Sequence, residues 1–370
     1  MHVRPGPRGG TEPVKSFYNL LVGGLVEIDG SYKSGSGTIL RDSILLSALL
    51  GRPVYVHNIR AKREKPGLRP QHLSVVEVVK TLTGGLCQGA SVGSKEVFFR
   101  PGGEIRSRDF FFDIGTAGSA TMLALTIIPI GLFSKRASSF KIRGGLFQDF
   151  APSFFHLKYV VVPLLRMMGA EIEIKMVRPG FVPKGGGEME VKTRPLDGPL
   201  SPLMLAEPGA MRDVVGIALS SHLKERKVSE RMARECKAVL RAKGYEANIE
   251  MLYDTNDSPA FEAPALQEGA ALAVWANFER GAIIGSDMVG EKGRSAETIG
   301  KRVASMLIED IESGATCDRF SSDQVILFCA LARGESLFKF PFLSEHMESR
   351  IWLVEQMLGA DVSVQGRKST

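Results

Sequence analysis

The sequence predicts an α/β (α+β) fold, in which a large domain of three repeated α/β units carries a small inserted α/β domain. Two observations predict it: a helix–turn–strand pattern that occurs three times, and a change in composition between about residues 201 and 284. The 370 residues are enough for two domains, and 44% hydrophobic with 24% charged residues is ordinary for a globular protein.

Each of the three units has the same parts: a helical stretch, a turn of small residues and a strand. The helices are 73–80, 157–168 and 350–358, the turns 84–85, 169–170 and 359–360, and the strands 96–99, 171–176 and 361–364. Polarity alternates along 171–176, which indicates a strand with one solvated face in a mixed or antiparallel sheet. This recurrence predicts an internally repeated α/β architecture.

The third unit arrives late because the intervening chain has a different character. Segment 223–243 is charge-rich and predicts an amphipathic helix, and strands are expected near 247–253 and 271–277. We therefore expect an inserted domain over 201–284, with the large domain formed by 21–200 and 285–370. The alternative is one irregular continuous domain.

The N-terminus lacks the apolar run of a signal peptide, and residues 1–20 are expected to be a disordered basic tail. The most apolar stretch, 120–133, has only 14 residues and contains Pro129, so it predicts a core helix that is too short to span a bilayer. Segments 39–50 and 325–332 are apolar on most faces and also predict core helices. No membrane partner is expected.

The net charge of +6 favours an anionic partner. The four cysteines are far apart in the sequence, and the six histidines are scattered. Neither set has the spacing of zinc ligands, so the sequence identifies no residue as a metal ligand. Reduced cysteines predict a cytoplasmic protein, or a nuclear one in a eukaryote.

His346 is the best candidate for a residue that forms a covalent bond during a reaction. Ser344 is expected to cap a helix, Glu345 suits the positive end of its dipole, and His346 falls in the first turn. This position favours the neutral, nucleophilic ring and places free N–H groups beside it for a phosphate. The alternative is an ordinary partly buried or solvated helix residue.

Segment 28–41 runs from a strand through a glycine-rich loop into a helix, an arrangement that can cradle phosphate with backbone N–H groups at Gly35 and Gly37. It is not a Walker A loop because the lysine of that motif is missing. An ordinary glycine turn is the alternative.

Segment 52–72 carries six cations against one acid, Glu64. A dense basic loop fixed by Pro66 suits a polyanion such as RNA or nucleotide phosphates, although such a run is often only a solvated face.

Further along, Phe320–Gln324 opens a helix, and Ser321 with Gln324 fits a capping box. The functional alternative there places Asp323 and Gln324 on a ribose or base.

Eight short motifs or pairs of motifs follow one another between residue 25 and the end of the chain. They are Ile28–Gly30 with Ile39–Arg41, Ile59–Leu68 with Gln71–Leu73, Phe99–Gly102, Gly115–Ser119, Gly185–Gly187, Val289–Lys292, Asp323-Gln324 and the helix that carries His346. The IRAxRxKPGL stretch at 59–68 is the most distinctive of them. Together they resemble the RNA 3′-terminal phosphate cyclase family.

The resemblance implies three repeated units with a small domain inserted before the third, in agreement with the pattern above. It also implies an ATP-dependent reaction assisted by a divalent cation (Mg or Mn), in which His346 takes AMP and passes it to an RNA 3′-phosphate. The neighbouring 2′-hydroxyl then displaces AMP and leaves a 2′,3′-cyclic phosphate. By position, Arg41, Arg60, Arg63 and Gln71 are expected to hold phosphate or RNA. The expected nucleotide contacts are Phe320, Ser321, Ser322, Asp323, Gln324, Gly35 and Gly37.

The chain also departs from the family pattern. Ser34 stands where the family usually has a glutamate, Leu125 where it has a glutamine, and 144–149 lacks the usual threonine and proline. Ser34 and Leu125 favour the alternative of a non-catalytic cyclase-like RNA-binding protein, such as a ribosome-assembly factor, whereas retention of His346 favours the enzyme. An enolpyruvyl transferase on a related repeated fold ranks lower because it does not explain His346. Oligomeric state is not predicted.

Overall fold

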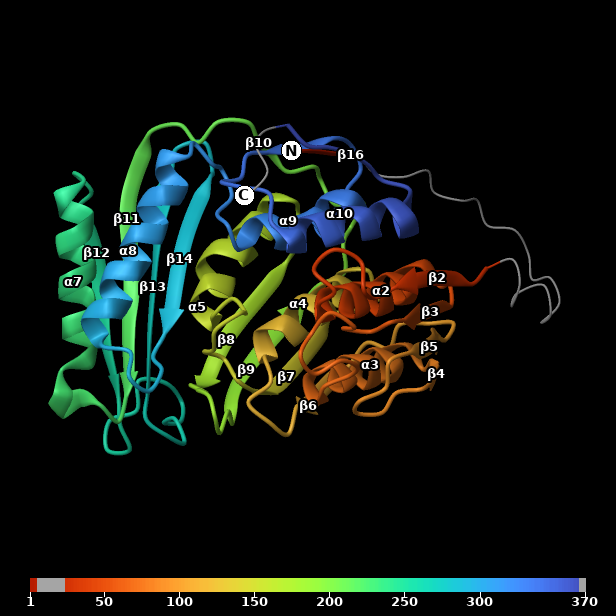
Figure 1. Cartoon of the computed structure of the whole chain (residues 1–370), viewed down its shortest axis with the longest axis horizontal. Helices are drawn as coiled ribbons and strands as arrows, with labels where there is room; N and C mark the ends of the chain where they lie inside the picture. Colours follow the sequence, from red (N-terminus) through yellow and green to blue (C-terminus); the bar gives the residue numbers. More distant parts are fainter. Residues whose placement is uncertain (5–23, 366–370) are drawn as a thin grey trace.

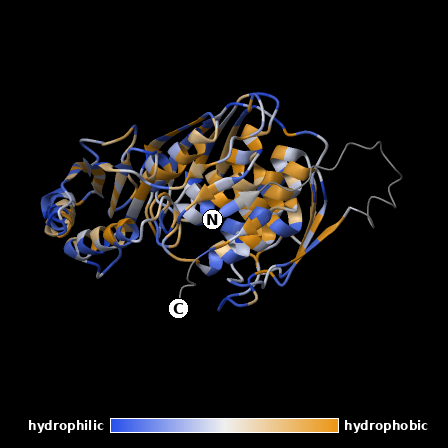
Figure 2. Ribbon diagram, turned by 90° about the horizontal axis from the view of Figure 1, so that it is seen from above, coloured by the Kyte–Doolittle hydropathy of each residue, from blue (hydrophilic) through white to orange (hydrophobic). Residues whose placement is uncertain are grey.

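Three four-stranded sheets surround a central group of helices in the computed structural model, which describes residues 1–4 and 24–365 (Figure 1). Helix α2 contacts α3, α4 and α10, and α9 contacts α10, so the helices of different units pack on one another. Seen from above, apolar residues gather on these helices (Figure 2). The predicted fold class is confirmed.

The first two units share one topology. The first comprises β2 (Val26–Asp29), α2 (Gly37–Leu50), β3 (Val54–His57), α3 (Pro70–Thr83), β4 (Leu86–Gln88) and β5 (Val97–Arg100). The second comprises β6 (Asp109–Asp113), α4 (Ala120–Leu132), β7 (Ser138–Gly144), α5 (Phe154–His156), η1 (Leu157–Val161), α6 (Val162–Met167), β8 (Ile172–Arg178) and β9 (Gly187–Thr193). In the orders β2-β3-β5-β4 and β6-β7-β9-β8, the first pair of strands is parallel and the others are antiparallel.

The third unit is completed by the first strand of the chain. It comprises β10 (Met204–Leu205), α9 (Ser321–Leu331), β15 (Ser336–Phe338), α10 (Glu345–Leu358), β16 (Asp361–Ser363) and β1 (His2–Arg4). The order β10-β15-β1-β16 repeats the same pattern, with β1 antiparallel to both neighbours. The expected disordered tail over 1–20 is therefore wrong for residues 1–4, because Met1 is buried and the backbone after it pairs with two strands. Residues 5–20 lie outside the described residues.

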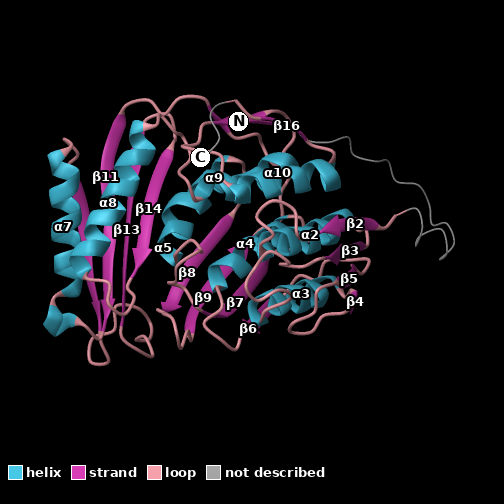
Figure 3. Cartoon of the chain, in the orientation of Figure 1, coloured by secondary structure: helices cyan, strands magenta, loops and turns pink. Residues whose placement is uncertain are grey.

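The inserted domain has its own sheet and core. It comprises β11 (Met211–Ser221), η2 (Lys224–Arg226), α7 (Val228–Ala242), β12 (Ala247–Asp254), β13 (Gly269–Phe278), β14 (Ile283–Val289) and α8 (Ala296–Glu312), with the strand order β12-β11-β13-β14. Helices α7 and α8 cover one face of this sheet (Figure 3). The expected end at 284 is too early: β14 pairs with β13, and Ile299, Val303 and Leu307 of α8 pack in this second core.

The other face of the inserted sheet packs on the large domain. Trp275 of β13 stacks on Tyr159 of η1, with ring centroids 4.5 Å apart and planes 5° apart. Ile217 and Leu219 of β11 join the core of the large domain. Both faces of the sheet are therefore covered. Within the part of the chain that the structure describes, no helix is both long and apolar enough to cross a membrane.

Candidate active site

His346 lies where the N-termini of two helices meet. Helix α10 begins at Glu345, and Ser344 caps it as predicted, with its hydroxyl accepting a hydrogen bond from the Met347 amide at 3.2 Å. His346 Nδ1 lies 3.4 Å from Ser36 Oγ and 3.5 Å from Thr38 Oγ1, at the start of α2. These hydroxyls occupy Nδ1 and leave Nε2 as the nitrogen available for attack.

The surroundings keep the His346 ring neutral. Partial removal from water lowers the pKa of His346, and the charges of Arg350, Arg41 and Arg63 lower it further, while Asp323 acts in the opposite direction. The residue as a whole is nevertheless exposed to solvent. A neutral imidazole is the form needed for nucleophilic catalysis.

Two adjoining cavities, of about 340 and 530 Å³, meet at His346. Residues that line both include Thr38, Arg41, Met122, Gln148, Phe150 and His346. The smaller cavity, here called the cationic cavity, adds Gly37, Arg60, Arg63, Gln71 and His72. The larger, here called the aromatic cavity, adds Phe320, Asp323, Gln324, Phe342 and residues of β14 and α8.

Arg41 is a half-buried cation that lacks a carboxylate partner among the described residues. Its Nη2 donates to Thr38 Oγ1 at 3.1 Å, and no carboxylate of the described residues lies within 4 Å of its guanidinium. Burial lowers its pKa to about 10, although Asp42 acts to raise it. Binding an anion would offset this desolvation. Beside it, Arg60 is fixed by donating to the carbonyls of Lys65 (2.7 Å) and Gly67 (2.9 Å).

His72 is a cavity residue that was not selected from the sequence. It is buried, and its pKa is lowered to about 3 by burial and then by Arg41, Arg60 and Arg69. Its Nδ1 accepts the Arg69 amide proton at 3.2 Å, so Nε2 carries the proton. A Cβ on Gly37 would lie 2.1 Å from that Nε2, so the glycine is needed for α3 to pack against α2. The available signal was the position of His72 directly after Gln71 in the first turn of a proline-initiated helix.

Not every predicted nucleotide contact reaches the cavities. Phe320, Asp323 and Gln324 line the aromatic cavity, and Gly37 lines the cationic one. Ser321 and Ser322 are fully buried, and the Ser322 hydroxyl donates to the Cys317 carbonyl at 3.2 Å. Gly35 lies beneath the Lys62 side chain and outside both cavities. Packing inside the helix and the loop thus keeps these three residues out of the lining of both cavities.

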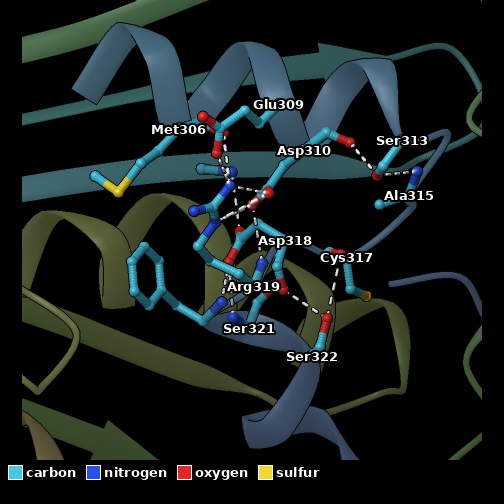
Figure 4. A network of polar contacts seen from close by, with 12 residues as sticks. Met306, Glu309, Asp310, Ser313, Ala315, Cys317, Asp318, Arg319, Ser321 and Ser322 are labelled. Atoms are coloured by element: carbon cyan, nitrogen blue, oxygen red, sulfur yellow. Dashed lines mark hydrogen bonds and ion pairs between the residues drawn. The ribbon is translucent and has the colours of Figure 1, made fainter. Parts of the chain in front are cut away.

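The expected capping box at α9 is wrong. Ser321 is the first helical residue, and Asp318 Oδ1 instead accepts from the amides of Phe320 (2.8 Å) and Ser321 (2.7 Å) (Figure 4). Asp318 Oδ2 accepts from the Gly285 amide at 2.9 Å and lies 3.2 Å from His156 Nε2. This carboxylate therefore joins α9, β14 and the α5–η1 segment, and it fixes the start of the helix that supplies Phe320.

The ion pair drawn in Figure 4 links α8 of the inserted domain to Arg319, two positions before α9 begins. Arg319 donates from Nη2 to Asp310 Oδ1 of α8 at 2.7 Å and to Glu309 at 2.8 Å. The Arg319 guanidinium also lies over the Phe342 ring, 5.5 Å from its centroid. The wall of the aromatic cavity is thus held by contacts from both domains.

The positions that depart from the family pattern are filled by packed side chains. Ser34 is buried, with its hydroxyl 3.0 Å from Ser36 Oγ and 2.9 Å from Ser349 Oγ, and Leu125 is buried in α4. Among residues 1–4 and 24–365, no cluster of three His, Cys, Asp or Glu side chains could hold a metal ion.

The chain is similar to known proteins of one family. A family model described as RNA 3′-terminal phosphate cyclase matches residues 32–364. A protein of that name from Staphylothermus marinus is 38% identical over 346 residues, covering 93% of this chain and 95% of the relative. The corresponding proteins from Pyrobaculum neutrophilum and Pyrococcus furiosus are 38% and 37% identical, over 90% and 92% of this chain and 93% and 96% of the relatives. The resemblance inferred from the sequence is confirmed, and the chain belongs to the RNA 3′-terminal phosphate cyclase family.

Proposed function

We propose that this protein converts an RNA 3′-terminal phosphate into a 2′,3′-cyclic phosphate, using ATP and a covalent histidine–AMP intermediate on His346. The observation that carries the proposal is the position of His346, whose Nε2 has no hydrogen-bond partner among the described residues and which lies at the junction of a cationic and an aromatic cavity. Family membership supports the reaction class.

In the first step, His346 Nε2 attacks the α-phosphorus of ATP, and pyrophosphate leaves. The Nδ1 proton stays on the ring and can be shared with Ser36 Oγ or Thr38 Oγ1, which stabilises the positive charge that develops on the imidazole. Arg41, without a carboxylate partner, is available to the phosphates, and Phe320 is available to stack on the adenine.

In the second step, an oxygen of the RNA 3′-phosphate attacks the phosphorus of the histidine-bound AMP, and Nε2 leaves with its electron pair. The product is an RNA–adenylate with a 3′–5′ pyrophosphate link. In the third step, the adjacent 2′-hydroxyl attacks the terminal RNA phosphorus and gives its proton to water. The bond from that phosphorus to the bridging oxygen breaks, AMP leaves with this oxygen, and the cyclic phosphate forms. Arg60, Arg63 and Gln71 line the cavity in which these anionic groups would lie.

The two cofactors fit the site differently. The nucleotide fits, because the cationic cavity suits phosphates and the aromatic cavity suits a base. A divalent cation would shield the phosphates, but Ser34 and its partners offer hydroxyls and not carboxylates. We therefore assign no step to the metal and no protein residue as its ligand.

The test is incubation with α-³²P-labelled ATP and a divalent cation, followed by denaturing electrophoresis. Label on the wild type that is absent from His346→Ala and stable to alkali but not to acid would establish the phosphoramidate. His57→Ala, which changes a histidine outside both cavities, is the matched control and should keep the label. An unlabelled wild type that still binds 3′-phosphate RNA would instead identify a non-catalytic RNA-binding relative.

A further inference from the structure

Phe150 is held in solvent at the junction of the two cavities. Its relative exposure is 105%, the largest of the exposed apolar side chains of the described residues, and it lines both cavities beside His346. Its φ of +66° lies in the left-handed region, which bulky side chains rarely adopt. An exposed aromatic ring on such a backbone is costly unless a ligand covers it.

The residues on either side of Phe150 are anchored by hydrogen bonds. The Asp149 carboxylate accepts from Arg294 Nη1 at 3.2 Å and Nη2 at 3.0 Å, which ties it to the inserted domain. On the other side, the Pro152 carbonyl accepts from Thr121 Oγ1 at 2.8 Å. With its amide oriented to satisfy both groups, Gln148 donates to the Ala117 carbonyl at 2.7 Å and accepts from the Ser119 amide at 3.1 Å. The segment is therefore anchored before and after the ring.

The surroundings of Phe150 distinguish between two possible partners. The aromatic cavity already has rings of its own, Phe320 and Phe342, for the base of a mononucleotide. The cationic cavity has Arg41, Arg60 and Arg63 for phosphate. Among its lining residues, Phe150 is the one phenylalanine, tyrosine or tryptophan, and the other two rings are histidines. A 3′-phosphate held by these arginines is carried on the same sugar as the terminal base. That base must therefore lie close to the mouth of the cationic cavity.

We propose that Phe150 stacks on the terminal nucleobase of the RNA 3′ end and thereby positions the 3′-phosphate for transfer. This inference rests on the proposed function for the nature of the substrate. Stacking on an aromatic side chain is tolerant of base identity because every base has a π-face. The protein should therefore require a terminal base but accept any of the four.

The experiment measures binding of a short 3′-phosphate RNA, and of the same RNA with an abasic terminal nucleotide, by fluorescence anisotropy. For the wild type, removing the terminal base should weaken binding by roughly tenfold, within the range for one stacked base. Phe150→Ala should weaken binding of the intact RNA by a similar factor and of the abasic RNA hardly at all, and Phe150→Trp should restore the preference. Phe111→Ala, which removes an exposed phenylalanine of β6 outside both cavities, is the matched control and should behave as the wild type.

Equal losses for the two RNAs in Phe150→Ala would overturn the proposal. It would also be overturned if Phe150→Ala bound intact RNA normally but lost labelling by ATP, because the ring would then stack on adenine. A wild type that is not labelled by ATP contradicts the proposed catalytic function alone. The RNA-binding comparison still decides whether Phe150 stacks on the terminal base.

Discussion

Arg350 and Asp42 form a buried ion pair beneath the candidate site, with Arg350 Nε 2.6 Å from Asp42 Oδ2. Their side chains are 4% and 7% exposed. Burial acts to lower the pKa of Arg350, but Asp42 and Asp323 outweigh it, and the pKa is raised. Because Arg350 lies one helical turn after His346 and also donates to the Asp323 carbonyl, the pair joins α10, α2 and α9.

The first prediction concerns stability. Arg350→Met should lower the free energy of unfolding by about 3–5 kcal/mol, because it leaves Asp42 buried without its partner. The double variant Asp42→Leu/Arg350→Met should lose less than the single one, and urea unfolding measures both. Arg241→Met, which breaks an exposed pair with Glu246, should cost at most about 1 kcal/mol. Additive losses in the double variant would argue against the pairing.

The second prediction concerns the pH dependence of labelling by ATP. His346 must be neutral to attack, and its pKa is lowered, so the rate should fall only as the pH drops below 6.5. Asp323→Asn removes a charge that raises this pKa and should move the fall to lower pH. Arg63→Gln removes a charge that lowers it and should move the fall to higher pH. Initial rates at saturating ATP separate these shifts from changes in affinity, and shifts in one common direction would contradict the assignment.

The third prediction concerns the contact between Gly37 and His72. Gly37→Ala should destabilise the protein by about 1–3 kcal/mol, because the new methyl group meets a buried imidazole at 2.1 Å. Adding His72→Ala should recover part of that loss, since the obstacle is gone. Gly103→Ala is the matched control: no heavy atom lies within 4 Å of its Cβ, and its effect should stay within about 0.5 kcal/mol. Thermal or urea unfolding of these three variants and of the wild type tests the contact.

Local patterns were sufficient to predict much of this fold. The apolar runs 39–50 and 120–133 became α2 and α4, and the charge-rich segment 223–243 contains α7. The cap at Ser344 and the place of His346 in the first turn also follow from neighbours in sequence. These features depend on residues within one or two turns of each other, which is why one sequence reveals them.

Features that depend on distant partners were missed or misplaced. Strand β1 has three residues and exists only because β15 and β16, more than 300 positions away, pair with it. The capping of α9 by Asp318 was missed because that carboxylate is also held by His156 and Gly285 from other segments. Phe150 gave no signal, because neither its exposure nor its backbone conformation follows from a pattern in the sequence.

The last prediction concerns stability and the buried pair formed by His156 and Asp318. Burial acts to lower the pKa of His156, but Asp318 outweighs it, so the folded-state pKa lies above 6.5. The folded protein therefore holds this proton more tightly than the unfolded chain, and the stabilisation is complete below pH 6.5 and lost as the pH rises through the folded-state pKa.

The pKa of Asp318 is lowered: burial acts to raise it, but His156 and the backbone amides outweigh that effect. The contribution of Asp318 to the free energy of unfolding is present above pH 3.8 and lost as the pH falls through the folded-state pKa of Asp318.

Urea unfolding at pH 6 and at pH 8.5 tests this charge state. His156→Gln keeps a donor near Asp318 but cannot titrate, so its free energy of unfolding should fall less between the two pH values than that of the wild type. Other groups titrate in both proteins, and the comparison removes their contribution. Parallel pH dependences would mean that His156 is neutral in the folded protein. Asp318 would then hold α9 and β14 through its backbone hydrogen bonds and not through an ion pair.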